Sequence, residues 1–112
     1  MKKILFVDDF KDTADALRDI ATALGHEGVV AYDGASALCA AAAEAFDIIF
    51  LDSMLPDANG IDVCLEIRRG PSKSARIIAL TGSNELVDKE RHCIDDWVLK
   101  PLYMDELERL LS

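Results

Sequence analysis

The sequence lacks an excess of basic residues and a long apolar segment, and each absence excludes a class of protein. The net charge is −9, from 12 Lys and Arg against 21 Asp and Glu. A nucleic-acid surface needs clustered positive charge, so we expect no direct nucleic-acid binding and a preference for cations or basic partners. No run of 18 apolar residues occurs, so no membrane-spanning helix is predicted.

Secretion signals and metal-binding cysteine pairs are also missing. The chain passes from Met-Lys-Lys directly into an apolar run, and we therefore expect a cytoplasmic location. Its three cysteines, Cys39, Cys64 and Cys93, form no CxxC motif and cannot all pair with one another. We expect them to be buried, reduced thiols, and the absence of His and Cys clusters argues against zinc.

Several enzyme signatures are absent as well. Neither GxxxxGK[ST] nor GxGxxG occurs, which argues against a nucleotide-binding loop. The first apolar run is followed by "DDFKD" and not by DxDx[TV], which argues against a haloacid-type phosphohydrolase. The calcium-loop pattern D-x-[DN]-x-[DN]-G is missing too.

Short apolar segments alternate with helical patterns along the whole chain. The 112 residues suit one domain, 1–112, and 51% of them are hydrophobic, as in a globular protein. Segments such as "IIFL" and "IIAL" are apolar on both faces, which is typical of a parallel sheet covered on each side. We predict strands over Lys3–Val7, Gly28–Tyr32, Asp47–Leu51, Arg76–Leu80 and Asp96–Leu99.

Helical spacing of apolar residues predicts five helices between and after these strands. The first ends near Gly25, with Asp12 or Thr13 as a possible N-terminal cap, and the fourth, Asn84–Cys93, is short. The order β-α repeated five times predicts a doubly wound α/β sheet. The remaining predicted helices run over 35–45, 61–68 and 104–111.

Polar residues follow the predicted strands at the edge where ligands bind in such sheets. Three carboxylates at this edge would repel one another, and a divalent cation would remove that penalty. Hard oxygen ligands with room for water favour Mg²⁺. Taken singly, the acidic pair is more commonly a helix-capping turn and Thr81 is more often an N-cap, but their joint placement at one edge favours a site. The residues are Asp8, Asp9, Asp52, Thr81 and Lys100.

Four sequence blocks resemble the receiver domain of two-component response regulators, over essentially the whole chain. In order they are "VDD", "LDSMLPDANGIDVC", "IIALTG" and "DDWVLKP". The resemblance implies a flavodoxin-like (βα)5 fold with strand order 2-1-3-4-5. The segment between Thr81 and Lys100 is shorter than usual in the family, which implies a shortened fourth helix and a reshaped surface beside it.

The resemblance also implies a role for each matching residue. Asp52 would take a phosphoryl group from a phosphohistidine, and Thr81 and Lys100 would then contact that group. Thr81 and Trp97 would report the modification by changing conformation. The implied Mg²⁺ ligands are Asp8 (through a bound water), Asp9, Asp52 and the backbone carbonyl of Met54.

Implied partners are a sensor histidine kinase or phosphotransfer protein and a downstream protein target, with no membrane contact. The chain would not be an enzyme beyond Mg²⁺-dependent self-phosphorylation and autodephosphorylation. Two alternatives stay open: an interaction module that works without phosphorylation, and a receiver cut from a hybrid kinase or longer regulator. The kinase, the pathway, the phosphoryl lifetime and the oligomeric state are not predicted.

Overall fold

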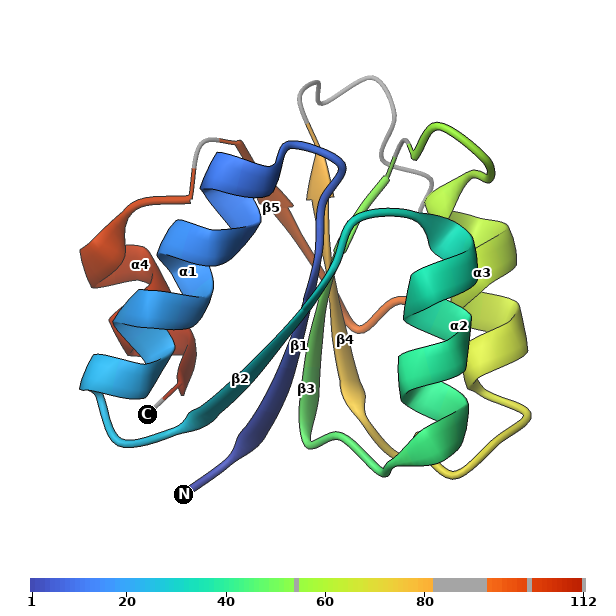
Figure 1. Ribbon diagram of the computed structural model, residues 1–112, viewed down its shortest axis with the longest axis horizontal. Helices are drawn as coiled ribbons and strands as arrows, with labels where there is room; N and C mark the ends of the chain where they lie inside the picture. Colours follow the sequence, from blue (N-terminus) through green and yellow to red (C-terminus); the bar gives the residue numbers. More distant parts are fainter. Residues whose placement is uncertain (54, 82–92, 101, 112) are drawn as a thin grey trace.

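Five parallel strands form one sheet in the order β2-β1-β3-β4-β5 (Figure 1). The computed structural model describes residues 1–53, 55–81, 93–100 and 102–111. The predicted fold is confirmed, and each predicted strand boundary lies within one residue of the observed one. The strands are β1 (Lys3–Val7), β2 (Glu27–Ala31), β3 (Ile48–Asp52), β4 (Arg76–Thr81) and β5 (Asp96–Leu99).

Helices cover both faces of the sheet (Figure 1). One face carries α1 (Lys11–Ala23) and α4 (Met104–Leu111), and the other carries α2 (Gly34–Ala43) and α3 (Gly60–Ile67). The short helix predicted over 84–93 lies almost entirely outside the described residues. Helix α4 is therefore the one predicted from the last apolar pattern of the chain.

The core has two halves because side chains alternate between the faces of each strand. Ile4 and Phe6 of β1 pack on the α1–α4 side, while Leu5 and Val7 pack on the α2–α3 side. The rings of Phe6 and Phe50 stack with their centroids 5.2 Å apart. All five residues of β3 are buried, which explains why that segment is apolar on both faces.

Both ends of α1 depend on loop geometry. At its C-terminal end Gly25 has a φ of +91°, and His26 donates its backbone N–H to the carbonyl of Ala21 at 3.0 Å, as expected for a glycine-terminated helix. The predicted cap by Asp12 or Thr13 is wrong. The N-cap position is Phe10, whose side chain has no acceptor, and its backbone N–H instead donates to Asp8 Oδ1 at 3.0 Å.

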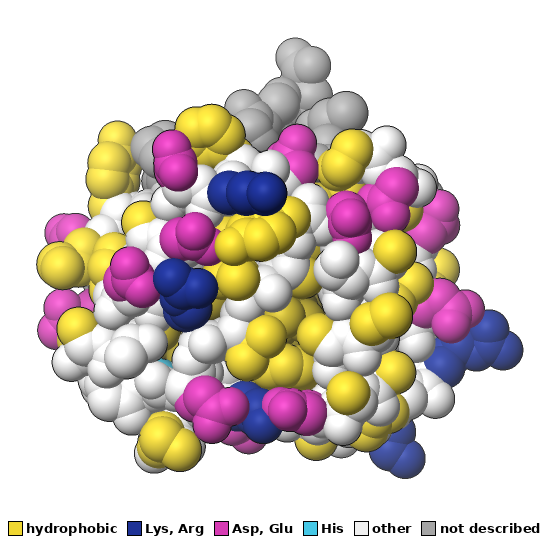
Figure 2. All heavy atoms as spheres, in the orientation of Figure 1, with side chains coloured by type: hydrophobic (Ala, Val, Ile, Leu, Met, Phe, Trp, Pro, Cys, Tyr) yellow, Lys and Arg dark blue, Asp and Glu magenta, His cyan; other side chains and the backbone are white. Residues whose placement is uncertain are grey.

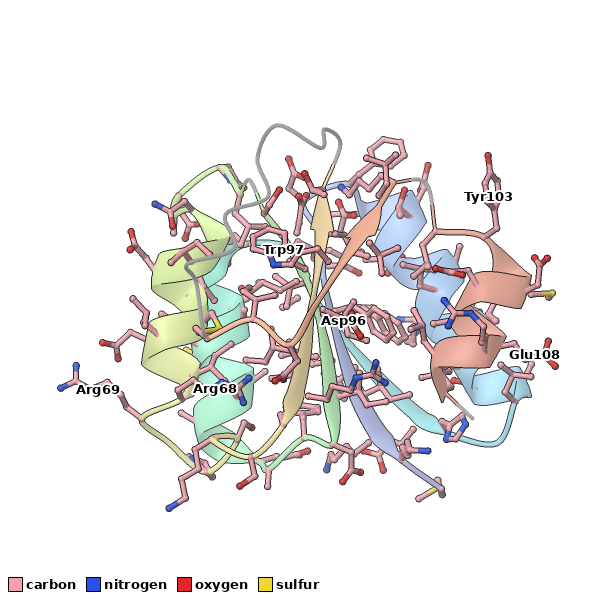
Figure 3. All side chains as sticks on the ribbon, turned by 180° about the vertical axis from the view of Figure 1, so that it is seen from behind. Arg68, Arg69, Asp96, Trp97, Tyr103 and Glu108 are labelled. Atoms are coloured by element: carbon pink, nitrogen blue, oxygen red, sulfur yellow. A yellow bond between two sulfur atoms is a disulfide. The ribbon has the colours of Figure 1, made fainter. Side chains whose placement is uncertain are left out.

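Helix α3 is fastened to the start of β5, which corrects the prediction of three buried thiols. Cys64 and Cys93 form a disulfide, and Cys39 is exposed. Arg68 adds to this link, because its guanidinium donates to the carbonyl of Cys93 at 2.7 Å and to Asp95 Oδ2 at 2.9 Å. Figure 3 shows Arg68 beside the entrance to β5. The entry into β5 is thus held covalently and by charge.

The surface agrees with the acidic composition. Figure 2 shows the side of the molecule that faces the viewer in Figure 1, where Asp and Glu side chains are spread over the surface and Lys and Arg are separated and not gathered. Within the described ranges no helix is both long and apolar enough to cross a membrane.

Reduction of the disulfide should lower the free energy of unfolding. The bond joins residues 29 apart in sequence, and constraining a loop of this length in the unfolded chain stabilises the fold by about 3.6 kcal/mol. Urea unfolding of Cys39→Ser, with and without dithiothreitol, measures the effect. We expect a lower midpoint under reduction, and no such shift in Cys93→Ser; equal midpoints for the oxidised and reduced protein would contradict the expectation.

Candidate functional site

The ends of the central strands bring the predicted site residues together. Strand β1 lies between β2 and β3, so the winding direction of the sheet reverses there. Val7 of β1 pairs with Leu51 of β3, and Asp8 and Asp52 follow these two residues. Side chains that leave such a point at the carboxyl edge face a shared crevice.

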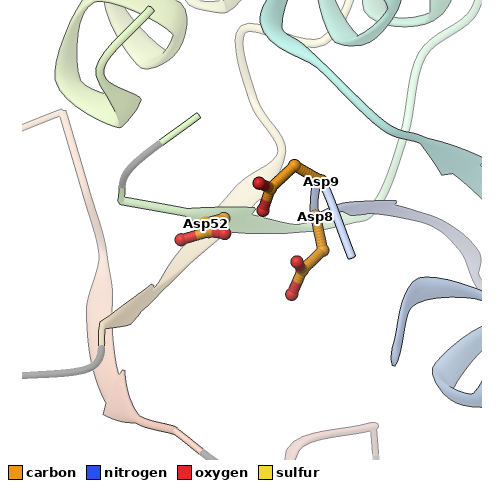
Figure 4. Close-up of side chains that lie close together, drawn as sticks. All are labelled: Asp8, Asp9 and Asp52. Carbon is orange, nitrogen blue, oxygen red and sulfur yellow. The ribbon is translucent and has the colours of Figure 1, made fainter. Parts of the chain in front are cut away.

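Three carboxylates meet at this edge. One carboxylate oxygen from each of Asp8, Asp9 and Asp52 lies within 4.8 Å of the other two (Figure 4). Asp8 and Asp52 are buried, whereas Asp9 is exposed. Like charges at this distance repel, and the repulsion is strongest between buried groups because water screens them poorly.

Lys100 supplies a positive charge to both buried carboxylates. Its Nζ lies 3.0 Å from Asp52 Oδ2 and 3.1 Å from Asp8 Oδ2. Burial lowers the pKa of Lys100, but the hydrogen bond and charge of Asp52, with smaller contributions from Asp8, raise it more. The pKa of Lys100 therefore ends above its usual value, and the ammonium is charged at neutral pH.

Thr81 and Lys100 are neighbours at the same edge. Thr81 ends β4 and is buried, and its carbonyl accepts the backbone N–H of Lys100 at 2.7 Å. Since β4 lies between β3 and β5, the side chain of Lys100 passes over β4 to reach Asp52 on β3. The hydrogen bond between the two backbones fixes the position of the Lys100 main chain, from which its side chain extends.

The residues fit a hard divalent cation. Asp8 Oδ2 is buried and makes no hydrogen bond within the described residues, although the Lys100 ammonium stands at ion-pair distance. Among the described residues, one ammonium faces three carboxylates, which leaves the cluster negative. All of its donors are oxygens, the ligands that such cations prefer. The fourth predicted ligand, the carbonyl of Met54, lies outside the described residues.

Trp97 lies on β5, three residues before Lys100 in the sequence (Figure 3). It pairs with Ala79 of β4, is partly buried against the α2–α3 half of the core, and lines a cavity of about 340 Å³ together with Leu65 and Ile94. Its role as a conformational reporter stays a prediction.

The turn after Asp52 contains contacts that sequence reasoning missed. Asn59 accepts the backbone N–H of Asp62 and caps α3. A Cβ on Gly60 would lie 2.9 Å from the carbonyl oxygen of Asp52, so only glycine lets α3 begin this close to β3. Asp57 accepts the backbone N–H groups of Gly34 and Ala35 at the start of α2. The "PDANG" turn signalled a loop but none of these partners.

Comparison with known proteins places the chain in a family. The family model described as "Response regulator receiver domain" matches residues 4–112. Response regulator ArlR of Staphylococcus saprophyticus subsp. saprophyticus is 35% identical over 113 residues, which cover 96% of this chain and 49% of that protein. The chain thus spans about half the length of this curated relative.

Solved structures agree with this assignment. A CheY-like receiver domain from Methylobacillus flagellatus matches with a TM-score of 0.91 and 26% identity, covering 99% of this chain and 96% of that one. Response regulator TrrA from Thermotoga maritima, in complex with Mg²⁺-BeF, matches with a TM-score of 0.86 and 32% identity, again covering 99% and 96%. The chain therefore belongs to the response regulator receiver domain family.

Proposed function

We propose that the chain accepts a phosphoryl group on Asp52 from a phosphohistidine, in a reaction that needs Mg²⁺. The observation that carries the proposal is the position of Asp52 Oδ2, 3.0 Å from the Lys100 ammonium and beside the carboxylates of Asp8 and Asp9. The complex of the similar TrrA with Mg²⁺-BeF supports the choice of cation. Asp8, Asp9 and Asp52 would hold it, with the Met54 carbonyl as a further ligand.

The chemistry explains why these residue types are needed. A carboxylate oxygen of Asp52 forms a bond to phosphorus as the phosphorus–nitrogen bond of the donor breaks, and the released imidazole takes up a proton. Both reactants are anionic, so charge repulsion opposes their approach. A bound Mg²⁺ supplies positive charge at this point. Lys100 adds a second positive charge beside the attacking oxygen of Asp52, and positioning with electrostatics provides most of the catalysis.

The change in conformation that signals phosphorylation would follow from the charge that the phosphoryl group adds. A phosphoryl group brings about −1.5 to −2 charges to a fixed point, next to Thr81 and within reach of Lys100. We propose that Thr81 contacts the phosphoryl group and that Trp97 changes its packing in response. The partners would be a histidine kinase or phosphotransfer protein and a downstream protein, in the cytoplasm, and the chain would not turn over a separate substrate. The alternative of an interaction module that works without phosphorylation is based on the shortened fourth helix. That segment lies almost entirely outside the described residues.

Incubation with acetyl phosphate and Mg²⁺ tests the proposal directly. Mass spectrometry of the intact protein should show a gain of one phosphoryl group in the wild type and in Asp19→Asn, an exposed acid on α1. Asp52→Ala should show no gain, because the nucleophile is missing. An unmodified wild type, or an undiminished gain in Asp52→Ala, would reject the proposal.

Asp9→Asn should raise the melting temperature of the metal-free protein by a few degrees. The substitution removes the cluster's exposed carboxylate, and Lys100 then neutralises a larger share of the remaining charge. The further rise on adding Mg²⁺ should shrink, because a ligand is lost. Thermal unfolding with EDTA and with Mg²⁺ measures both effects. Asp12→Asn, at the start of α1 but outside the cluster, should show neither; a metal-free Asp9→Asn protein that melts lower than wild type would contradict the charge argument.

Lys100→Met separates binding from catalysis. The variant keeps a long side chain but no charge, so Mg²⁺ affinity should be retained or increased, since a competing cation is removed. The rate of phosphorylation at saturating Mg²⁺ should fall about 100-fold, as for loss of one group that stabilises transition-state charge. Calorimetry and a time course with acetyl phosphate give the two quantities. A wild-type rate in Lys100→Met would remove the lysine from the mechanism.

A further inference from the structure

We infer that Asp57 is a positioning residue that fastens the loop after the phosphoacceptor to the start of α2 and so sets the cation affinity of the site. The inference rests on the proposed function. Asp57 Oδ1 lies 2.8 Å from the backbone nitrogen of Gly34, and Oδ2 lies 3.0 Å from that of Ala35. Both oxygens of one carboxylate thus bridge two segments that are more than 20 residues apart in sequence.

The bridge is a favourable electrostatic contact. The first backbone N–H groups of a helix have no partner within the helix, and the helix dipole attracts negative charge to that end. The hydrogen bonds from Gly34, and then from Ala35, hold the pKa of Asp57 below its usual value. The carboxylate is therefore charged at neutral pH, where the bridge is formed.

A second acidic residue, Asp33, caps the start of α2 and makes no hydrogen bond to the loop after β3 within the described residues. Asp33 is the N-cap of α2, and its Oδ1 accepts the backbone N–H of Ser36 at 2.7 Å. Asp33 belongs to the chain that leads into α2, whereas Asp57 comes from the loop between β3 and α3. Loss of either acid weakens the start of α2, but only loss of Asp57 releases the loop.

The loop and the helix are also fitted to each other sterically. A Cβ on Gly34 would lie 3.1 Å from Asp57 Oδ1 and 3.2 Å from the Cβ of Ala58, so the loop approaches α2 closely at this glycine. On its other side the loop is tied to the sheet, since Ser53 donates its backbone N–H to Leu80 at 2.9 Å. Residues 55–59, a short way after Asp52 in the sequence, are thus held between the start of α2 and the end of β3.

This arrangement couples the cation site to α2. A cation held by Asp52 favours the ordered loop, and an ordered loop favours the contact between Asp57 and α2. Coupling of this kind is reciprocal, so whatever strengthens one contact strengthens the other. Mg²⁺ should therefore slow the exchange of the Gly34 and Ala35 amide hydrogens.

The test compares Asp57→Ala with the matched control Asp33→Ala. Calorimetry gives the Mg²⁺ affinity, and amide hydrogen exchange by NMR gives the protection of Gly34 and Ala35 with and without Mg²⁺. We expect Asp57→Ala to weaken the Mg²⁺ affinity about fivefold and to abolish the Mg²⁺-dependent protection. Asp33→Ala should lower the melting temperature but leave the affinity within about twofold. Asp57→Asn, which keeps one acceptor, should fall between wild type and Asp57→Ala and serves if the alanine variant does not fold.

Three outcomes would overturn the inference. They are wild-type Mg²⁺ affinity in Asp57→Ala, equal loss of affinity in Asp33→Ala, and unchanged exchange at Gly34 and Ala35 on adding Mg²⁺ to the wild type. A wild-type protein that binds Mg²⁺ but takes no phosphoryl group defeats the proposed function alone, because affinity and exchange still report on Asp57. A wild type that binds no Mg²⁺ defeats both.

Discussion

The contact between the Lys100 ammonium and two buried carboxylates is the constraint on which the site depends. Asp8 and Asp52 come from different strands, and without an opposite charge their burial side by side would be costly. Lys100 lies 3.0 Å and 3.1 Å from their Oδ2 atoms, but with Asp9 present the cluster is still negative. Because of this remaining negative charge, the site is suited to bind a cation. A cation beside a carboxylate would reduce the repulsion between that carboxylate and a phosphoryl group.

The rest of the fold brings these three side chains together. The parallel sheet brings the ends of β1 and β3 together where the winding reverses, and β5 places Lys100 within reach across β4. Arg68 and the disulfide hold the entry into β5, so the strand that leads to Lys100 is fixed at its start. The loop after Asp52 is held against α2 by Asp57. These contacts on both sides of the site hold the three like charges in place.

The fold and most of the site were predictable from the sequence, because the patterns that indicate them lie within short segments of the chain. Apolar runs such as "IIFL" have the period of buried strands, and a polar residue after each run marks the carboxyl edge, so Asp8, Asp52 and Lys100 could be placed together. The Asp57 bridge could not be found this way, since a side chain that bonds backbone groups over 20 residues distant leaves no periodic pattern. The disulfide was missed for a similar reason, because it depends on α3 meeting the entry of β5 and not on cysteine spacing. The start of α1 was mispredicted because Asp8, outside the helix, accepts the N–H of Phe10.

Titration with Mn²⁺ observed by NMR tests the central claim most directly, since this paramagnetic ion broadens the signals of nearby amides and takes the same oxygen ligands as Mg²⁺. The account predicts saturable broadening centred on residues 8, 9 and 52, which excess Mg²⁺ reverses and which is lost when Asp52 is replaced by Ala. Broadening spread over the many surface carboxylates, or unaffected by Mg²⁺, would contradict the idea that these three side chains form one cation site.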